Sequence, residues 1–215
     1  MLYRRGVIFK MKYLTLVILC VLSILEVSAE NLAQVVIGNS GEPATLDPHK
    51  YNLRLEETLL NDLFLGLTTF NAKGEIVPGA AKSWTASEDG LTWTFTLRDD
   101  LKWSDGKALN AEDFVFSLRR LQDPKTAASL SYFLYMIKNA EAVNKGERPI
   151  ESLGVHAKGS HTLIIELEKP YPYLLERLLY PTGFPVPKHA IEAFGDNWVK
   201  PKNWVSNGAF VLSDW

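Results

Sequence analysis

The stretch GAAKSWTASEDGLTWTFTLRDDLKWSDGKALNAEDFVFSLRRLQDP, residues 79–124, decides the fold class. Within it, residues 83–87 and 91–98 flank Asp89-Gly90, a dipeptide that favours a tight turn between antiparallel strands. Large apolar residues alternate with threonines along residues 91–98, which predicts one apolar sheet face and one solvated face. The stretch therefore begins with a predicted β-hairpin.

The same stretch continues into a predicted helix. Asn110 is a favourable N-cap residue, and Asp113 stands three positions later, where its side chain completes a capping box. Asp123-Pro124 ends the helix, because proline cannot continue it. The buried stripe is predicted to consist of Phe114, Leu118 and Leu121. A strand pair followed by a capped helix predicts a mixed α/β fold.

Hydrophobic periodicity and turn residues place the other elements. Leucines at four-residue intervals predict a helix over residues 55–67, with Gly66 near its end. The remaining predicted elements are a strand at 34–38, helices at 130–143, 171–179 and 188–194, a strand pair at 153–157 and 162–167, and a strand that begins within 207–215.

The N-terminus has the pattern of a secretory signal peptide. Met11-Lys12 precede an apolar run over residues 14–25, which small residues follow. The run is shorter than the roughly 20 residues that span a membrane, so we predict cleavage after Ala29; the alternative is an uncleaved anchor. Cys20, the one cysteine of the chain, would leave with the signal, so the mature protein would have no disulfide.

Composition and motifs exclude several function classes. The chain has 23 Lys and Arg against 25 Asp and Glu, and removal of the basic segment 1–29 makes it more acidic, which argues against nucleic acid as a partner. The histidines lack zinc-motif spacing, and neither a P-loop nor a serine-nucleophile motif is present. We therefore expect no catalytic residues, no metal site and no cofactor.

Several short motifs occur together in the order and spacing of one family. Besides residues 79–124, they are SGEP at 40–43, LDPH at 46–49, GV at 154–155, TL at 162–163, PVPK at 185–188 and NGAF at 207–210. In this combination the chain resembles the large solute-binding proteins of peptide-type ABC importers, family 5 of the extracellular solute-binding proteins. Within that family it is most similar to the periplasmic oligopeptide-binding proteins.

The resemblance implies a periplasmic-binding-protein-like fold, in which two lobes close on the ligand and an extra domain packs on the first lobe. After the signal peptide, residues 30–64 and 185–215 would belong to the first lobe, and residues 65–184 would form the extra α+β domain. Because members of the family are much longer, the resemblance implies that the chain is truncated before the second lobe.

The function that the resemblance implies is binding without chemistry. A periplasmic monomer would capture short peptides and deliver them to the membrane permease subunits of an ABC importer. The alternatives are a receptor for dipeptides or another small solute, a truncated remnant that binds nothing, and, more distantly, a secreted hydrolase. Since the second lobe supplies many ligand contacts in such receptors, we expect residues 30–215 alone to bind peptide weakly or not at all.

The resemblance also implies candidate ligand contacts. The ligand-facing segment of the family maps to Tyr51, Asn52, Leu53 and Arg54. Members of the family can carry an acidic residue and a glycine at the second and third of these positions, so this chain departs from the pattern there. An aromatic contact a few residues after the Asp-Pro pair maps to Leu130 or Tyr132, and we favour Tyr132.

Overall fold

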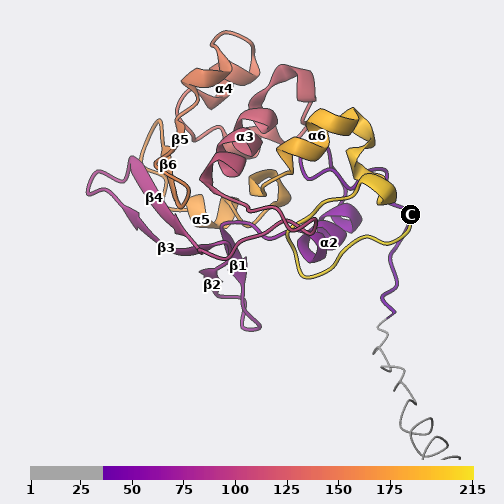
Figure 1. Cartoon of the computed structure of the whole chain (residues 1–215). Helices are drawn as coiled ribbons and strands as arrows, with labels where there is room; N and C mark the ends of the chain where they lie inside the picture. Colours follow the sequence, from indigo (N-terminus) through magenta and orange to yellow (C-terminus); the bar gives the residue numbers. More distant parts are fainter. Residues whose placement is uncertain (1–35) are drawn as a thin grey trace, which may run out of the picture. The chain divides into compact units, whose positions relative to one another are not determined.

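The predicted hairpin forms one edge of a four-stranded antiparallel sheet. In the computed structural model, which describes residues 36–215, β3 (Ala81–Ala86) pairs with β4 (Thr92–Leu97), and Gly90 in their turn has a φ of 68°. β6 (Thr162–Glu166) pairs with the other edge of β4, and β5 (Val155–Ala157) pairs with β6 (Figure 1). Both strand pairs that the sequence predicts are therefore confirmed.

α3 (Ala111–Gln122) covers this sheet, and its predicted capping box is confirmed. The Asn110 side chain accepts a hydrogen bond from the Glu112 backbone N–H at 2.8 Å, and the Asp113 carboxylate accepts one from the Asn110 N–H at 2.8 Å. α3 packs against β5 and β6 and also contacts α6 (Lys188–Phe194) (Figure 1). The core between helix and sheet consists of Phe95, Leu97, Phe114, Leu118, Leu163 and Ile165, all buried.

The other elements are short. α2 (Arg54–Leu63) precedes a two-stranded sheet of β1 (Thr68–Phe70) and β2 (Ile76–Pro78); α4 (Ala140–Asn144) and α5 (Leu174–Arg177) follow later in the chain. The 3₁₀ helices are η1 (Pro124–Thr126), η2 (Ser131–Leu134), η3 (Ile150–Ser152), η4 (Pro181–Gly183), η5 (Gly195–Val199) and η6 (Pro201–Asn203). In residues 36–215 we find no helix with the length and apolar character needed to cross a membrane.

The helix predicted over residues 55–67 ends earlier, at Leu63. The Leu65 N–H donates to the side-chain oxygen of Asn207 at 3.1 Å, and the Asn207 amide donates back to the Leu65 carbonyl at 2.9 Å. Gly208 donates its N–H to the Leu63 carbonyl at 2.9 Å, and a Cβ on this glycine would lie 2.4 Å from the Leu63 carbonyl carbon. A distant segment therefore takes the backbone groups that a longer helix would use.

The helix predicted over residues 130–143 is broken. It becomes η2, an irregular segment and α4, because Ile137 leaves the helix to bridge Leu167 in an antiparallel contact. Asn139 then adopts a left-handed φ of 63°, which a continuous helix does not allow. The helix predicted over residues 171–179 is shorter than expected and covers only α5.

The predictions for the two ends of the chain also differ from the structure. Residues 207–215 form no strand, because residues 207–210 bond to the end of α2 instead of to a sheet. Residues 36–38 are irregular, and the rest of the strand predicted at 34–38 lies outside the described residues. The predicted signal segment 1–29, with its cleavage after Ala29, also lies outside them.

Candidate ligand-binding site

A buried carboxylate shapes the backbone that leads into α2. Glu56, whose side chain is buried, accepts hydrogen bonds from the N–H groups of Ala44 at 2.9 Å and Thr45 at 3.2 Å on one oxygen. Its other oxygen accepts the N–H groups of Asn52 at 3.0 Å and Leu53 at 3.1 Å. One side chain thus holds two separate loop segments and fixes where α2 begins.

A buried ionic cluster ties the same loop to α3. Arg120 donates to both carboxylate oxygens of Asp47, at 3.0 and 2.6 Å, and also donates to Nδ1 of His49 at 3.0 Å. Because arginine cannot accept, Nδ1 is the acceptor, and Nε2 carries the hydrogen that faces the Phe184 carbonyl at 3.4 Å. The cluster therefore connects the loop before α2, α3 and the segment after α5.

The surroundings of the cluster favour a neutral His49 and an ionised Asp47. Burial, with a smaller effect from the adjacent Arg120 charge, lowers the pKa of His49 to about 3, so the imidazole is neutral. Burial opposes ionisation of Asp47, but its hydrogen bond to Arg120 and the charge of Arg120 prevail and lower its pKa. One carboxylate and one guanidinium thus form a compensated pair in the interior.

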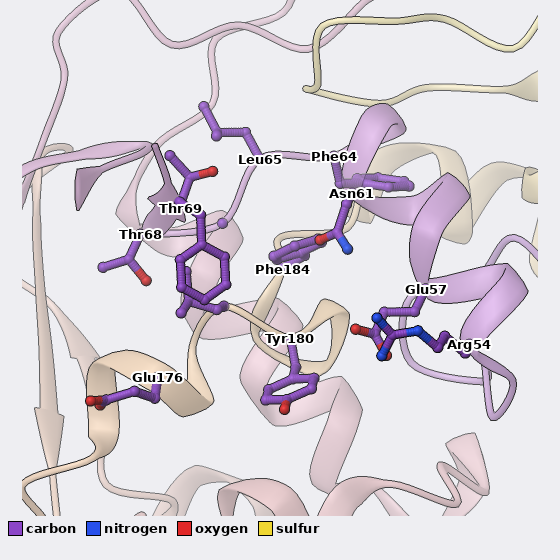
Figure 2. A pocket seen from close by; sticks show the side chains of 13 residues that line it. Arg54, Glu57, Asn61, Phe64, Leu65, Thr68, Thr69, Glu176, Tyr180 and Phe184 are labelled. Carbon is purple, nitrogen blue, oxygen red and sulfur yellow. The ribbon is translucent and has the colours of Figure 1, made fainter. Parts of the chain in front are cut away.

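A cavity of about 620 Å³ opens beside α2, along the length of the helix. Its charged residues are Arg54, Glu57 and Glu176, and Figure 2 shows Arg54 and Glu57 projecting from α2, with Tyr180 in the middle and Glu176 toward the other end. The other lining residues are Asn61, Phe64, Leu65, Gly66, Thr68, Thr69, Phe70, Leu179 and Phe184. We call this the first cavity.

The walls of the first cavity fit together at close range. A Cβ on Gly66 would lie 2.7 Å from the Phe184 ring, so this position allows the ring to pack directly against the backbone. Thr68 donates its hydroxyl to the Leu175 carbonyl at 3.3 Å, which joins β1 to α5. The cavity is therefore built on α2, β1 and the α5–η4 segment, which are far apart in the sequence.

A second cavity of about 270 Å³ lies close to the first. It is lined by Tyr132, Phe133, Met136, Tyr171 and Arg177. The ring of Phe133 is 5.3 Å from that of Tyr180, which lines the first cavity, in an edge-to-face arrangement. Each cavity therefore contributes one ring to this aromatic pair.

Two of the predicted contact residues line cavities, and a third is buried nearby. Arg54 lines the first cavity and Tyr132, which is 55% exposed, lines the second. Tyr51 is buried and lines neither cavity; burial raises the pKa of its hydroxyl, and the nearby Glu57, Tyr180 and Tyr132 raise it further. Within the described residues the Tyr51 hydroxyl has no hydrogen-bond partner.

The other predicted contacts lie elsewhere. Asn52 and Leu53 are exposed, and only their backbone groups are held, by the Glu56 carboxylate. Leu130 is half-buried, packs against the hydrophobic core and lines neither cavity. The α5–η4 segment was not among the predicted contacts, although its run of tyrosines and prolines, YPYLLERLLYPTGFP at 171–185, was a visible signal.

No group of three or more His, Cys, Asp or Glu side chains within residues 36–215 is arranged to hold a metal ion. A further cavity of about 480 Å³ lies beside α3 and α6 and contains none of the predicted contact residues.

Comparison with known proteins identifies the family. The sequence pattern of "Bacterial extracellular solute-binding proteins, family 5 Middle" matches residues 75–215. The periplasmic oligopeptide-binding protein OppA of Escherichia coli K12 is 43% identical over 185 residues, which is 85% of this chain and 34% of that protein. The probable deoxycholate-binding periplasmic protein YgiS of the same organism is 43% identical over 179 residues, 82% of this chain and 34% of that protein.

A solved structure shows the same fold. Haemophilus influenzae OppA in complex with the peptide RPPGFSPFR matches with a TM-score of 0.82 and 40% identity, over 84% of this chain and 36% of that one. The predicted fold class, mixed α/β of the periplasmic-binding-protein type, is confirmed. The chain spans about a third of the length of these relatives. It belongs to the bacterial extracellular solute-binding proteins of family 5.

Proposed function

We propose that the chain is part of a periplasmic receptor that captures short peptides and delivers them to an ABC-type import permease. The observation that carries this proposal is the first cavity, which combines charged and aromatic walls in about 620 Å³. That volume lies within the range of small-molecule sites. Relatives named as periplasmic oligopeptide-binding proteins support the same function.

The chemistry of the first cavity suits a zwitterionic ligand. Glu57 and Glu176 offer negative charge to a peptide ammonium group, and Arg54 offers a planar guanidinium to a carboxylate. Phe70 is 58% exposed and lies on the wall with Tyr180, so apolar side chains of varied shape find ring surfaces there. These groups bind and do not react, and we propose a receptor without enzymatic activity.

The proposal includes the organisation and location of the protein. Residues 1–29 would direct export and be removed, residues 30–64 and 185–215 would belong to the first lobe, and residues 65–184 would form the extra domain. The protein would act as a periplasmic monomer. Sequence resemblance supports this division.

NMR titration of the isotope-labelled chain with alanine tripeptides tests the proposal, because it measures even millimolar dissociation constants. We expect saturable shifts for Arg54, Thr69 and Tyr180, and their loss in Arg54→Gln. Arg148→Gln is the matched control, because Arg148 is exposed and lines none of the described cavities. Saturation without such shifts would refute binding at the first cavity, and no saturation would refute peptide binding by this chain. Mass spectrometry of the same samples would reveal any hydrolysis.

A second candidate ligand is an amphipathic carboxylate. The relative named as a probable deoxycholate-binding protein motivates it, and the apolar rings of Phe64, Phe70 and Phe184 beside Arg54 favour it. Titration with monomeric deoxycholate, alone and in competition with tripeptide, decides between the two: the ligand with the lower dissociation constant at the first cavity is the better candidate.

A further inference from the structure

The second cavity contains an arginine without an acidic partner. Within residues 36–215, Arg177 forms no ion pair with any carboxylate. The neighbouring acidic residue on α5, Glu176, lines the first cavity. Arg120, in contrast, is fully paired with Asp47. The charge of Arg177 is therefore available to a ligand.

The guanidinium of Arg177 is held in place on two sides. Its Nε donates to the Tyr171 hydroxyl at 3.2 Å, and its central carbon lies 5.4 Å from the centre of the Phe133 ring. Stacking on an aromatic ring and a bond through Nε leave the two terminal nitrogens as the edge that matches a carboxylate. A group restrained in this way loses little freedom when it binds.

The size and walls of the second cavity indicate what enters it. A volume of about 270 Å³ is below the range of whole-ligand sites, so it suits one chemical group of a larger ligand. Tyr132, Phe133, Tyr171 and Met136 surround the aliphatic stem of such a group, and the Tyr171 hydroxyl, which accepts from Arg177, can still donate its own hydrogen. The single guanidinium of Arg177 would balance the charge of one carboxylate on the ligand.

The two cavities are close enough to serve one ligand. Tyr180 and Phe133 touch across the boundary, and consecutive residues of α5, Glu176 and Arg177, line the first and the second cavity. We propose that the second cavity is a carboxylate subsite, in which Arg177 binds an acidic group of a ligand whose body occupies the first cavity. This inference rests on the proposed function and specifies its ligand class: acid-bearing peptides.

The test compares peptides that differ by one charge. Alanine tripeptides carrying one Glu or one Gln, at each position in turn, are titrated into the purified full chain as free acids and as C-terminal amides. We expect the best acidic peptide to bind about 10- to 100-fold more tightly than its neutral counterpart, the range of a charge-assisted hydrogen bond. The amides show whether the acid is a side chain or the C-terminus.

Variants assign the effect to Arg177. Arg177→Gln should reduce the acidic-to-neutral ratio to about 1, and Arg177→Lys should keep part of it, because the charge stays and the planar fork is lost. Tyr171→Phe, which keeps the ring and the charge, should lower the ratio a few-fold. Arg148→Gln makes the same charge change on an exposed residue and should leave the ratio unchanged.

The outcomes separate the two proposals. If tripeptides bind but the Glu-to-Gln ratio and the acid-to-amide ratio are both near 1 in the unmodified chain, or both are unchanged in Arg177→Gln, the carboxylate subsite is refuted and peptide binding stands. If Arg177→Gln lowers only the melting temperature, Arg177 is a structural cap on Phe133. If no tripeptide binds at all, the proposed function fails, and this inference fails with it.

Discussion

Replacement of Glu56 by Gln tests whether one side chain organises the entrance to the candidate site. The carboxylate accepts four backbone N–H groups, two on each oxygen, from Ala44, Thr45, Asn52 and Leu53. The glutamine oxygen can serve only one of these pairs. Its NH₂ group would then face the other two N–H donors, so two hydrogen bonds are lost and donors are brought together.

The magnitude follows from these bonds. A buried donor without an acceptor costs about 1–3 kcal/mol, and these N–H groups are only partly buried, so water relieves some of the loss. We expect Glu56→Gln to destabilise the protein by about 2–4 kcal/mol. With a urea m-value of about 2 kcal/mol/M, the unfolding midpoint should fall by about 1–2 M.

The assay is urea unfolding followed by tryptophan fluorescence. Glu112→Gln is the matched control, because Glu112 is an exposed carboxylate in the first turn of α3. It should cost no more than about 0.5 kcal/mol, the loss of one favourable charge near the helix dipole. A Glu56→Gln midpoint within the error of this control, with an unchanged m-value, would refute the four-bond role of Glu56.

Three further changes have expected outcomes. The contribution of His49 to stability should be full above pH 6.5 and should fall as the pH decreases toward 3, by up to about 1.4 kcal/mol per pH unit, because His49 stays neutral in the folded protein while the unfolded chain takes up a proton. Urea unfolding across this pH range measures the slope, and a slope equal to that of His49→Gln would contradict the prediction. Gly66→Ala should cost about 1–3 kcal/mol because its Cβ meets the Phe184 ring, whereas Gly41→Ala, whose nearest atom is at 3.9 Å, should leave the melting temperature unchanged. Phe95→Ala should lower the free energy of unfolding by about 3–5 kcal/mol in urea, because the ring is fully buried. The control is Phe210→Ala, because the Phe210 side chain is 63% exposed, and equal stability of the two variants would place the core elsewhere.

Sequence patterns predicted the parts of the fold that local chemistry decides. The β3–β4 turn depends on Gly90 and the start of α3 on Asn110, and both were predicted. Each signal lies within a few residues of the structure it controls, so no knowledge of distant segments is needed.

Predictions failed where distant segments compete for the backbone. Leu65 would extend α2 if Asn207, 142 residues away, did not bond both of its backbone groups. Ile137 likewise leaves its helix for Leu167. At the candidate site, resemblance rather than periodicity pointed to Arg54, and it gave no indication of Arg177, because a helix as short as α5 leaves no periodic signal.

The same long-range bonds make binding and stability inseparable at this site. Arg120 holds the loop of Asp47 and His49, and His49 holds the carbonyl of Phe184, whose ring lines the first cavity. Protonation of His49 would place a second positive charge beside Arg120 in the interior, which the single carboxylate of Asp47 cannot balance. Acid should therefore loosen the segment after α5 before the sheet unfolds. Ligand affinity should decline at a higher pH than the tryptophan signal of global unfolding, and coincidence of the two transitions would show that the cluster stabilises the whole domain rather than the cavity wall.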